Sequence, residues 1–92
     1  MLQAHVYISG FVQGVGFRAY TRSKAKKLGL NGWVRNLSDG RVEAVVQGDR
    51  DIIEKLLKQC RRGPFFANVK DIVVDWEEQE ESFFEFKKLP TI

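Results

Sequence analysis

The chain has 92 residues, of which 43% are hydrophobic and 29% charged, with a net charge of +3, one Cys and one His. We expect one domain over residues 1–92, because this length gives room for one core and the composition excludes disorder, a membrane span and a signal peptide. One Cys and one His exclude an intrachain disulfide and a cysteine or multi-histidine metal cage, so we expect a cytoplasmic protein that binds neither metal nor membrane.

The first half of the chain alternates between strand and helix patterns. Residues 5–12 alternate with period two and include β-branched and aromatic side chains, which predicts a strand. A glycine-rich segment follows, and residues 18–28 then carry apolar side chains at helical spacing. Residues 32–37 predict a second strand. An Asp-Gly dipeptide, typical of hairpin turns, separates it from a third strand over residues 41–47.

The second half continues the alternation. Asp49 and Asp51 are candidate caps of a second helix, whose apolar positions are Ile52, Ile53, Leu56, Leu57 and Cys60. Residues 69–76 predict a fourth strand, and residues 83–86 can add a short fifth. The order βαββαβ predicts an α+β ferredoxin-like sandwich, with an antiparallel sheet and both helices on one face. Many unrelated functions share this fold, so it names none of them.

Charge is unevenly distributed along the chain. Residues 1–62 hold 12 Lys and Arg against 5 Asp and Glu, whereas residues 63–92 hold 3 against 7. The basic part suits an anionic partner, although a solvated face explains it equally well. Runs of five or six like charges are absent, and the third strand lacks the pattern of RNA-binding sheets, so we expect no nucleic-acid partner.

The residues that suggest chemistry lie between Gly10 and Asn36. A glycine-rich turn from a strand into a helix aligns backbone N–H groups at the positive end of the helix dipole. Gly14 and Gly16 let the backbone approach a ligand closely. Arg18 falls in the first helical turn, where a cation is unfavourable unless an anion binds beside it. A tight turn next to a solvated arginine is the alternative interpretation. The Lys-Ser/Thr ending of a Walker loop is absent, which disfavours nucleotide hydrolysis.

Two segments resemble the signatures of the acylphosphatase family. Residues 10–18, Gly-Phe-Val-Gln-Gly-Val-Gly-Phe-Arg, resemble the first signature, and residues 32–36, Gly-Trp-Val-Arg-Asn, resemble the second. The second continues through Gly40, Val42 and Gly48. The resemblance covers essentially the whole chain, although the C-terminal third matches in pattern only. Phe11 fills a slot that is often basic in the family.

The resemblance implies hydrolysis of a small acyl phosphate to a carboxylate and inorganic phosphate, with no metal and no cofactor. It implies that Arg18 binds the phosphoryl group and that Asn36 orients the attacking water. It also implies a phosphate-binding loop made of Gln13, Gly14, Val15, Gly16, Phe17 and Arg18. Inorganic phosphate is then both product and competitive inhibitor. We expect a monomer, and the physiological acyl phosphate stays open.

Elementary chemistry supports the same assignment. The leaving group of an acyl phosphate is a weakly basic carboxylate, so its hydrolysis needs no strong general acid. It needs charge balance at the phosphoryl oxygens and an aligned water. Backbone amides and Arg18 can supply the charge balance. The neutral Asn36 amide offers a donor and an acceptor without repelling phosphate. A hydrogen bond from Asn36 to the turn at residues 38–40 is the alternative for this side chain.

Two functions from different classes remain open. The first is a stand-alone acylphosphatase, and the second is a non-catalytic module that binds phosphate or carbamoyl phosphate in the same loop. Both predict phosphate binding, but only the first predicts turnover. Outside this region, we expect His5 at the surface or a sheet edge and Cys60 in the core. The roles of Phe83, Phe84 and Phe86 stay open.

Overall fold

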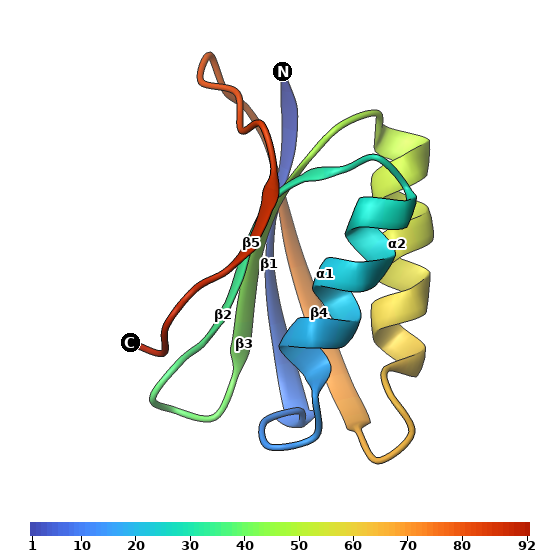
Figure 1. The fold of residues 1–92 in the computed structure, drawn as a ribbon, viewed down its shortest axis with the longest axis vertical. Coiled ribbons are helices and arrows are strands. Elements are labelled where there is room, and N and C mark those ends of the chain that lie inside the picture. The colour runs from blue at the N-terminus through green and yellow to red at the C-terminus, as the bar shows by residue number, and fades with distance from the viewer.

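The computed structural model describes residues 1–92 as a five-stranded sheet with two helices on one face (Figure 1). The elements in chain order are β1 (Leu2–Phe11), α1 (Phe17–Lys27), β2 (Asn31–Asn36), β3 (Val42–Gln47), α2 (Arg50–Arg62), β4 (Asn68–Glu78) and β5 (Phe86–Lys88). The predicted ferredoxin-like order is therefore confirmed. Neither helix has the length and apolarity that a membrane crossing requires.

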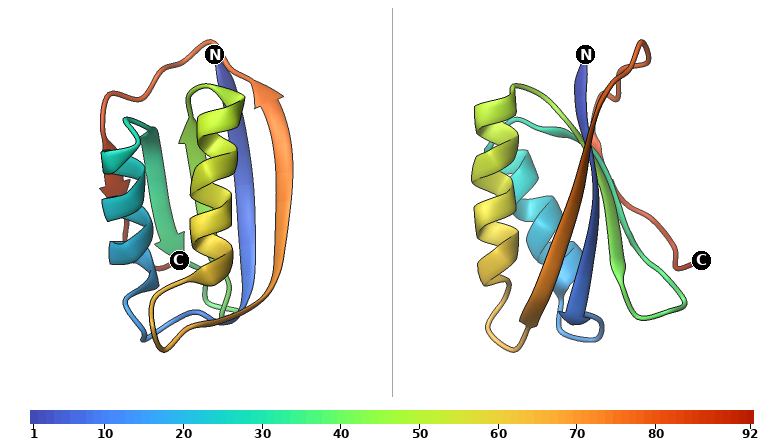
Figure 2. Two further views of the ribbon diagram at one scale, coloured as in Figure 1. Left: turned by 90° about the vertical axis from the view of Figure 1, so that its right-hand side faces the viewer. Right: turned by 180° about the vertical axis from the view of Figure 1, so that it is seen from behind.

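The strands lie in the order β4-β1-β3-β2-β5 (Figure 2). Each neighbouring pair is antiparallel except β2 and β5, which run parallel, so the sheet is mixed rather than wholly antiparallel. The fifth strand also begins later than predicted. Phe86 pairs with Gly32 and is 2% exposed, whereas Phe84 is 91% exposed. Burial of Phe86 in the core thus decides which of the three phenylalanines begins β5.

The core lies between the sheet and the helices. Ala4, Val6 and Ile8 of β1 are buried, which is the alternation expected of a strand with one face on the core. Each helix buries one face: Phe17, Thr21 and Ala25 in α1, and Ile53, Leu56 and Cys60 in α2. The prediction that Cys60 is a core residue is confirmed. Asp49 occupies the N-cap position of α2, although its side chain makes no capping hydrogen bond.

The central strand β3 is buried at all six positions, where alternation predicts burial on one face only. Glu43, on the helix-free face, accepts a hydrogen bond from Arg35 Nε at 2.7 Å and lies 2.6 Å from His5 Nε2. Burial alone would raise the pKa of Glu43, but the hydrogen bonds from His5 and Arg35 outweigh it and lower the pKa. His5 therefore lies within β1 as a half-buried partner of Glu43, not at the predicted surface or edge position.

The topology brings four segment ends together. β1 and β2 are both antiparallel to β3, and β5 is parallel to β2, so the carboxyl ends of β1, β2 and β5 share one edge of the sheet. Helix α1 follows β1 directly, so its N-terminus lies at the same end of the molecule (Figure 2). This arrangement makes neighbours of the glycine-rich loop, the end of β2 and the end of β5.

Candidate functional site

A small cavity of about 120 Å³ opens at this end of the molecule. Its walls come from three separate parts of the chain: Val12, Gly14, Gly16, Phe17, Arg18, Ala19, Asn36 and Lys88. Arg18 and Asn36, which the sequence singles out, therefore line one cavity together with the glycine loop. A larger cavity of about 380 Å³ lies against Trp33 and residues 82–85, and none of the predicted site residues lines it.

The loop presents free backbone donors. Gly16 is the N-cap of α1 with φ 79° and ψ 20°, a left-handed conformation that favours glycine. The first backbone hydrogen bond of the helix runs from Tyr20 N–H to Gly16 O at 3.0 Å. The N–H groups of residues 14–18 donate none of the backbone hydrogen bonds. They lie at the positive end of the helix dipole, which is the arrangement that binds anions.

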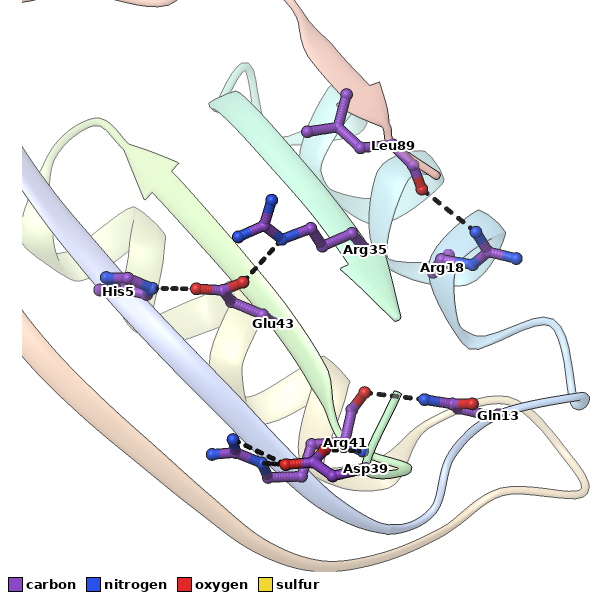
Figure 3. Close-up of polar contacts among 8 residues, drawn as sticks. All are labelled: His5, Gln13, Arg18, Arg35, Asp39, Arg41, Glu43 and Leu89. Carbon is purple, nitrogen blue, oxygen red and sulfur yellow. Dashed lines mark hydrogen bonds and ion pairs between the residues drawn. The ribbon is translucent and has the colours of Figure 1, made fainter. Parts of the chain in front are cut away.

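The residue that follows β5, Leu89, holds the side chain of Arg18 in place. Nη1 of Arg18 donates a hydrogen bond to Leu89 O at 3.2 Å (Figure 3). Leu89 N–H in turn donates to Val34 O at 2.8 Å. None of the ion pairs in the structure involves Arg18. Its positive charge is therefore positioned by a neutral carbonyl group and stays uncompensated beside the free loop amides.

Asn36 is the last residue of β2, and its Oδ1 is buried without a hydrogen-bond partner in the protein. A buried unpaired acceptor costs free energy, so a polar ligand beside it gains by pairing with it. The turn after β2 is closed without this side chain. Gly40 N–H donates to Leu37 O, and Arg41 N–H donates to Asp39 Oδ1. The alternative in which Asn36 bonds the turn does not apply.

Gln13 and Val15 contribute differently from the other loop residues. The Gln13 side chain donates to Arg41 O at 2.9 Å (Figure 3) and to Leu37 O at 2.7 Å, which ties the loop to the turn after β2. Val15 is partly buried against the core. Neither residue lines the cavity.

The sequence interpretation missed Lys88, which lines the cavity from β5. The only sequence signal is a basic residue two positions after the last of three closely spaced phenylalanines, and it gains meaning once β5 is placed beside β2 in parallel. Val12 and Ala19 also line the cavity and flank the predicted loop. No Asp, Glu or His contributes to its walls, so the cavity suits an anion.

Comparisons with known proteins agree with this geometry. Residues 4–88 match the family model for acylphosphatase. An acylphosphatase of Chloroflexus aurantiacus is 56% identical over 78 residues, which is 85% of each chain. The crystal structure of an acylphosphatase from Bacillus subtilis matches with a TM-score of 0.94 and 36% identity, covering 97% of this chain and 99% of that one.

The chain is also similar to a segment of a larger protein. Full-length HypF, in its phosphate- and nucleotide-bound form, matches with a TM-score of 0.86 and 32% identity. That match covers 99% of this chain but 12% of HypF. The match to the family model and the relatives of similar length show that the chain belongs to the acylphosphatase family, which is a family of hydrolases.

Proposed function

We propose that this acylphosphatase binds the phosphoryl group of an acyl phosphate between the loop amides and Arg18, while Asn36 orients the attacking water. One observation carries the proposal. One small cavity is lined by Gly14, Gly16, Phe17 and Arg18, whose N–H groups make no backbone hydrogen bond, and by Asn36. The guanidinium of Arg18 forms no ion pair there. The sources of positive charge come from the loop and helix, and the neutral amide comes from β2.

The loop and Arg18 bind the phosphoryl group and balance its negative charge. The phosphoryl oxygens accept hydrogen bonds from the backbone N–H groups and from the free edge of the guanidinium. In the transition state, charge spreads over the equatorial oxygens of the phosphoryl group, so fixed donors stabilise it without rearranging. Each well-placed donor of this kind is worth about 3–4 kcal/mol in related acyl-transfer sites.

Asn36 acts on the water. Its side-chain amide holds the water by a hydrogen bond and so fixes the direction from which the oxygen approaches phosphorus. The water oxygen forms a bond to phosphorus, and the bond between phosphorus and the acyl oxygen breaks. The carboxylate leaves with the bonding electron pair, and the water proton passes to a phosphoryl oxygen. The cavity wall contains no carboxylate or imidazole group that could serve as a general base.

Because Arg18 and Asn36 have different roles, their alanine variants should differ in phosphate binding. Arg18→Ala removes charge that acts on bound phosphate and on the transition state, so both phosphate inhibition and turnover of benzoyl phosphate fall, with kcat lower by about 100-fold or more. Asn36→Ala removes only the water contact, so turnover falls by a similar factor while inorganic phosphate still inhibits the residual activity. Steady-state kinetics with inorganic phosphate as inhibitor measure both effects.

Matched controls keep the result specific. Arg61→Ala removes an exposed arginine from the end of α2, and Asn31→Ala removes the asparagine at the other end of β2. Neither residue lines the cavity, so both variants keep parental kinetics. Parental turnover in Asn36→Ala would contradict the water-orienting role.

The second candidate, a non-catalytic phosphate-binding module, has one supporting observation. The chain is similar to a segment of HypF, a structure described with bound phosphate. This alternative predicts phosphate binding with no hydrolysis of benzoyl phosphate. Hydrolysis that persists in the presence of a chelator supports the proposed mechanism, whereas its loss on chelation would contradict it.

A further inference from the structure

Helix α1 carries a stripe of positive charge that begins at the proposed site. Arg18, Arg22 and Lys26 follow each other at four-residue spacing, which places them on one face of the helix. The rise of an α-helix puts Arg22 about 6 Å and Lys26 about 12 Å along the axis from Arg18. The helix contains no acidic residue. Like charges at this spacing weaken a helix slightly, so helix stability does not explain the stripe.

A second cavity follows this stripe. It has a volume of about 290 Å³ and is lined by Ala19, Arg22, Ser23, Lys26 and Lys88. Ala19 and Lys88 also line the smaller cavity that holds Arg18 and Asn36. The two cavities therefore meet at these two residues and form one groove, which runs from the loop along α1 beside β5. We call the part beyond Lys88 the basic groove.

The cations of the basic groove have no acidic partners. Arg22, Lys26 and Lys88 take part in none of the ion pairs, and no carboxylate lines either cavity. Arg22 Nε donates to Phe86 O at 3.3 Å, which fixes this side chain against β5. The helix dipole accounts for a lysine in the last turn of α1, but not for Arg22 or for Lys88 on a strand.

We propose that the basic groove binds a second anionic group, a carboxylate or a phosphate, at the far end of the acyl chain. The enzyme then prefers acyl phosphates that carry such a group over those with a neutral end. This inference rests on the proposed function, because the reacting phosphoryl group must occupy the loop for the acyl chain to extend past Lys88. The second anion lies about 6 Å or more from the first, beside Arg22 and Lys26.

Matched substrates test the preference. Adipoyl phosphate and hexanoyl phosphate have the same chain length and differ in a terminal carboxylate in place of a methyl group. We expect kcat/KM to be about fivefold higher for adipoyl phosphate, mainly through KM, as one or two solvent-exposed charge contacts provide. 5-Phosphonopentanoyl phosphate carries a terminal phosphonate instead, and the larger of the two preferences identifies the anion that the groove favours.

Variants on α1 distinguish binding in the basic groove from attraction by the overall positive charge of the protein. Lys26→Gln lowers the ratio of kcat/KM between the charged and neutral substrates toward one, and Lys26→Arg retains it. Lys27→Gln removes the same charge one residue along the helix, outside both cavities, and keeps the ratio. Equal kcat/KM for all three substrates, or an equal loss of preference in Lys27→Gln, would overturn the inference. Failure to hydrolyse any of them would instead overturn the proposed function.

Discussion

The single thiol of the protein, Cys60, is shielded from reaction. Cys60 lies on the buried face of α2, is 2% exposed and has its Sγ 3.8 Å from the hydroxyl group of Thr21. Burial raises the pKa of this thiol to about 11. Thiolate is the reactive form of cysteine, so both access and ionisation limit Cys60 in the folded protein. Cys60 is thus not a candidate nucleophile in the folded protein.

Thiol labelling checks this prediction. At pH 8, we expect Cys60 in the native protein to react with a thiol reagent such as dithionitrobenzoate far more slowly than in guanidinium chloride, where both protections are lost. Saturating inorganic phosphate slows the native reaction further, because binding to the folded state lowers the unfolded population. Rapid labelling of the native protein would contradict the buried position of this thiol.

Among the site residues, the sequence predicts those whose role depends on local structure. Glycines between a strand and a helix predict the loop, and its helical-turn position singles out Arg18. The role of Asn36 comes from the family resemblance, since a strand-end asparagine has no distinctive pattern of its own. Lys88 could not be predicted, because its place depends on which strand β5 pairs with and in which direction. The side-chain bonds of Gln13 likewise depend on a turn more than twenty residues away.

At the level of elements, periodicity predicts the helices and first four strands because each pattern is complete within about ten residues. It fails at β5. Three phenylalanines lie within residues 83–86, and only contacts with distant Gly32 and Val34 place the strand at Phe86–Lys88. It fails also at β3, where neighbouring strands and side chains bury Glu43 on the face that alternation assigns to solvent. Long-range contacts decide both features.

The helix-free face of the sheet makes stability depend on pH. The pKa of Glu43 is lower in the folded protein than its ordinary value. A carboxyl group with a depressed pKa stabilises the fold above its unfolded pKa, and this stabilisation is lost as the pH falls through its folded pKa. At pH 7, we expect Glu43→Gln to lower the free energy of unfolding by about 1 kcal/mol or more, because Arg35 and His5 lose their charged acceptor.

Urea unfolding at several pH values measures this effect. The difference between parent and Glu43→Gln narrows as the pH falls below about 4.3, the ordinary pKa of a glutamate. Glu54→Gln is the control, since Glu54 pairs with Arg50 on the exposed surface of α2 and such pairs contribute at most about 0.5 kcal/mol. A pH-independent difference for Glu43→Gln would show that packing, not charge, stabilises this position.

At the scale of the whole molecule, an acidic segment lies far from the candidate site. β4 is antiparallel to β1 and pairs Glu78 with Leu2, so the acidic residues 77–81 lie at the end opposite the cavity (Figure 1). Arg18, Arg22 and Lys88 lie at or near the cavity end. The acidic residues 77–81 thus lie away from the cavity, and the basic side chains of Arg18 and Lys88 line it at the other end. An anionic substrate is attracted toward that end.

Salt dependence of the kinetics checks this prediction. The Debye length falls from about 30 Å at 0.01 M salt to about 3 Å at 1 M, and the molecule measures 33 × 24 × 20 Å. At low salt the whole basic end acts on the substrate, whereas at high salt only the groups in contact do. We expect KM for benzoyl phosphate to rise several-fold over this range with little change in kcat. An unchanged KM would mean that contacts within the cavity provide all of the attraction.

The cavity draws its walls from six residues between Val12 and Ala19, from Asn36 and from Lys88, and Leu89 holds Arg18 in place. Loop closure over so long a stretch of chain is slow, and the parallel pairing of β5 with β2 requires β2 to be in place already. We therefore expect native-like secondary structure to form before a working site during refolding. The return of hydrolytic activity should then mark the pairing of β5 with β2. A chain that ends before residues 86–89 would lack Lys88 in the cavity wall and the carbonyl group that holds Arg18.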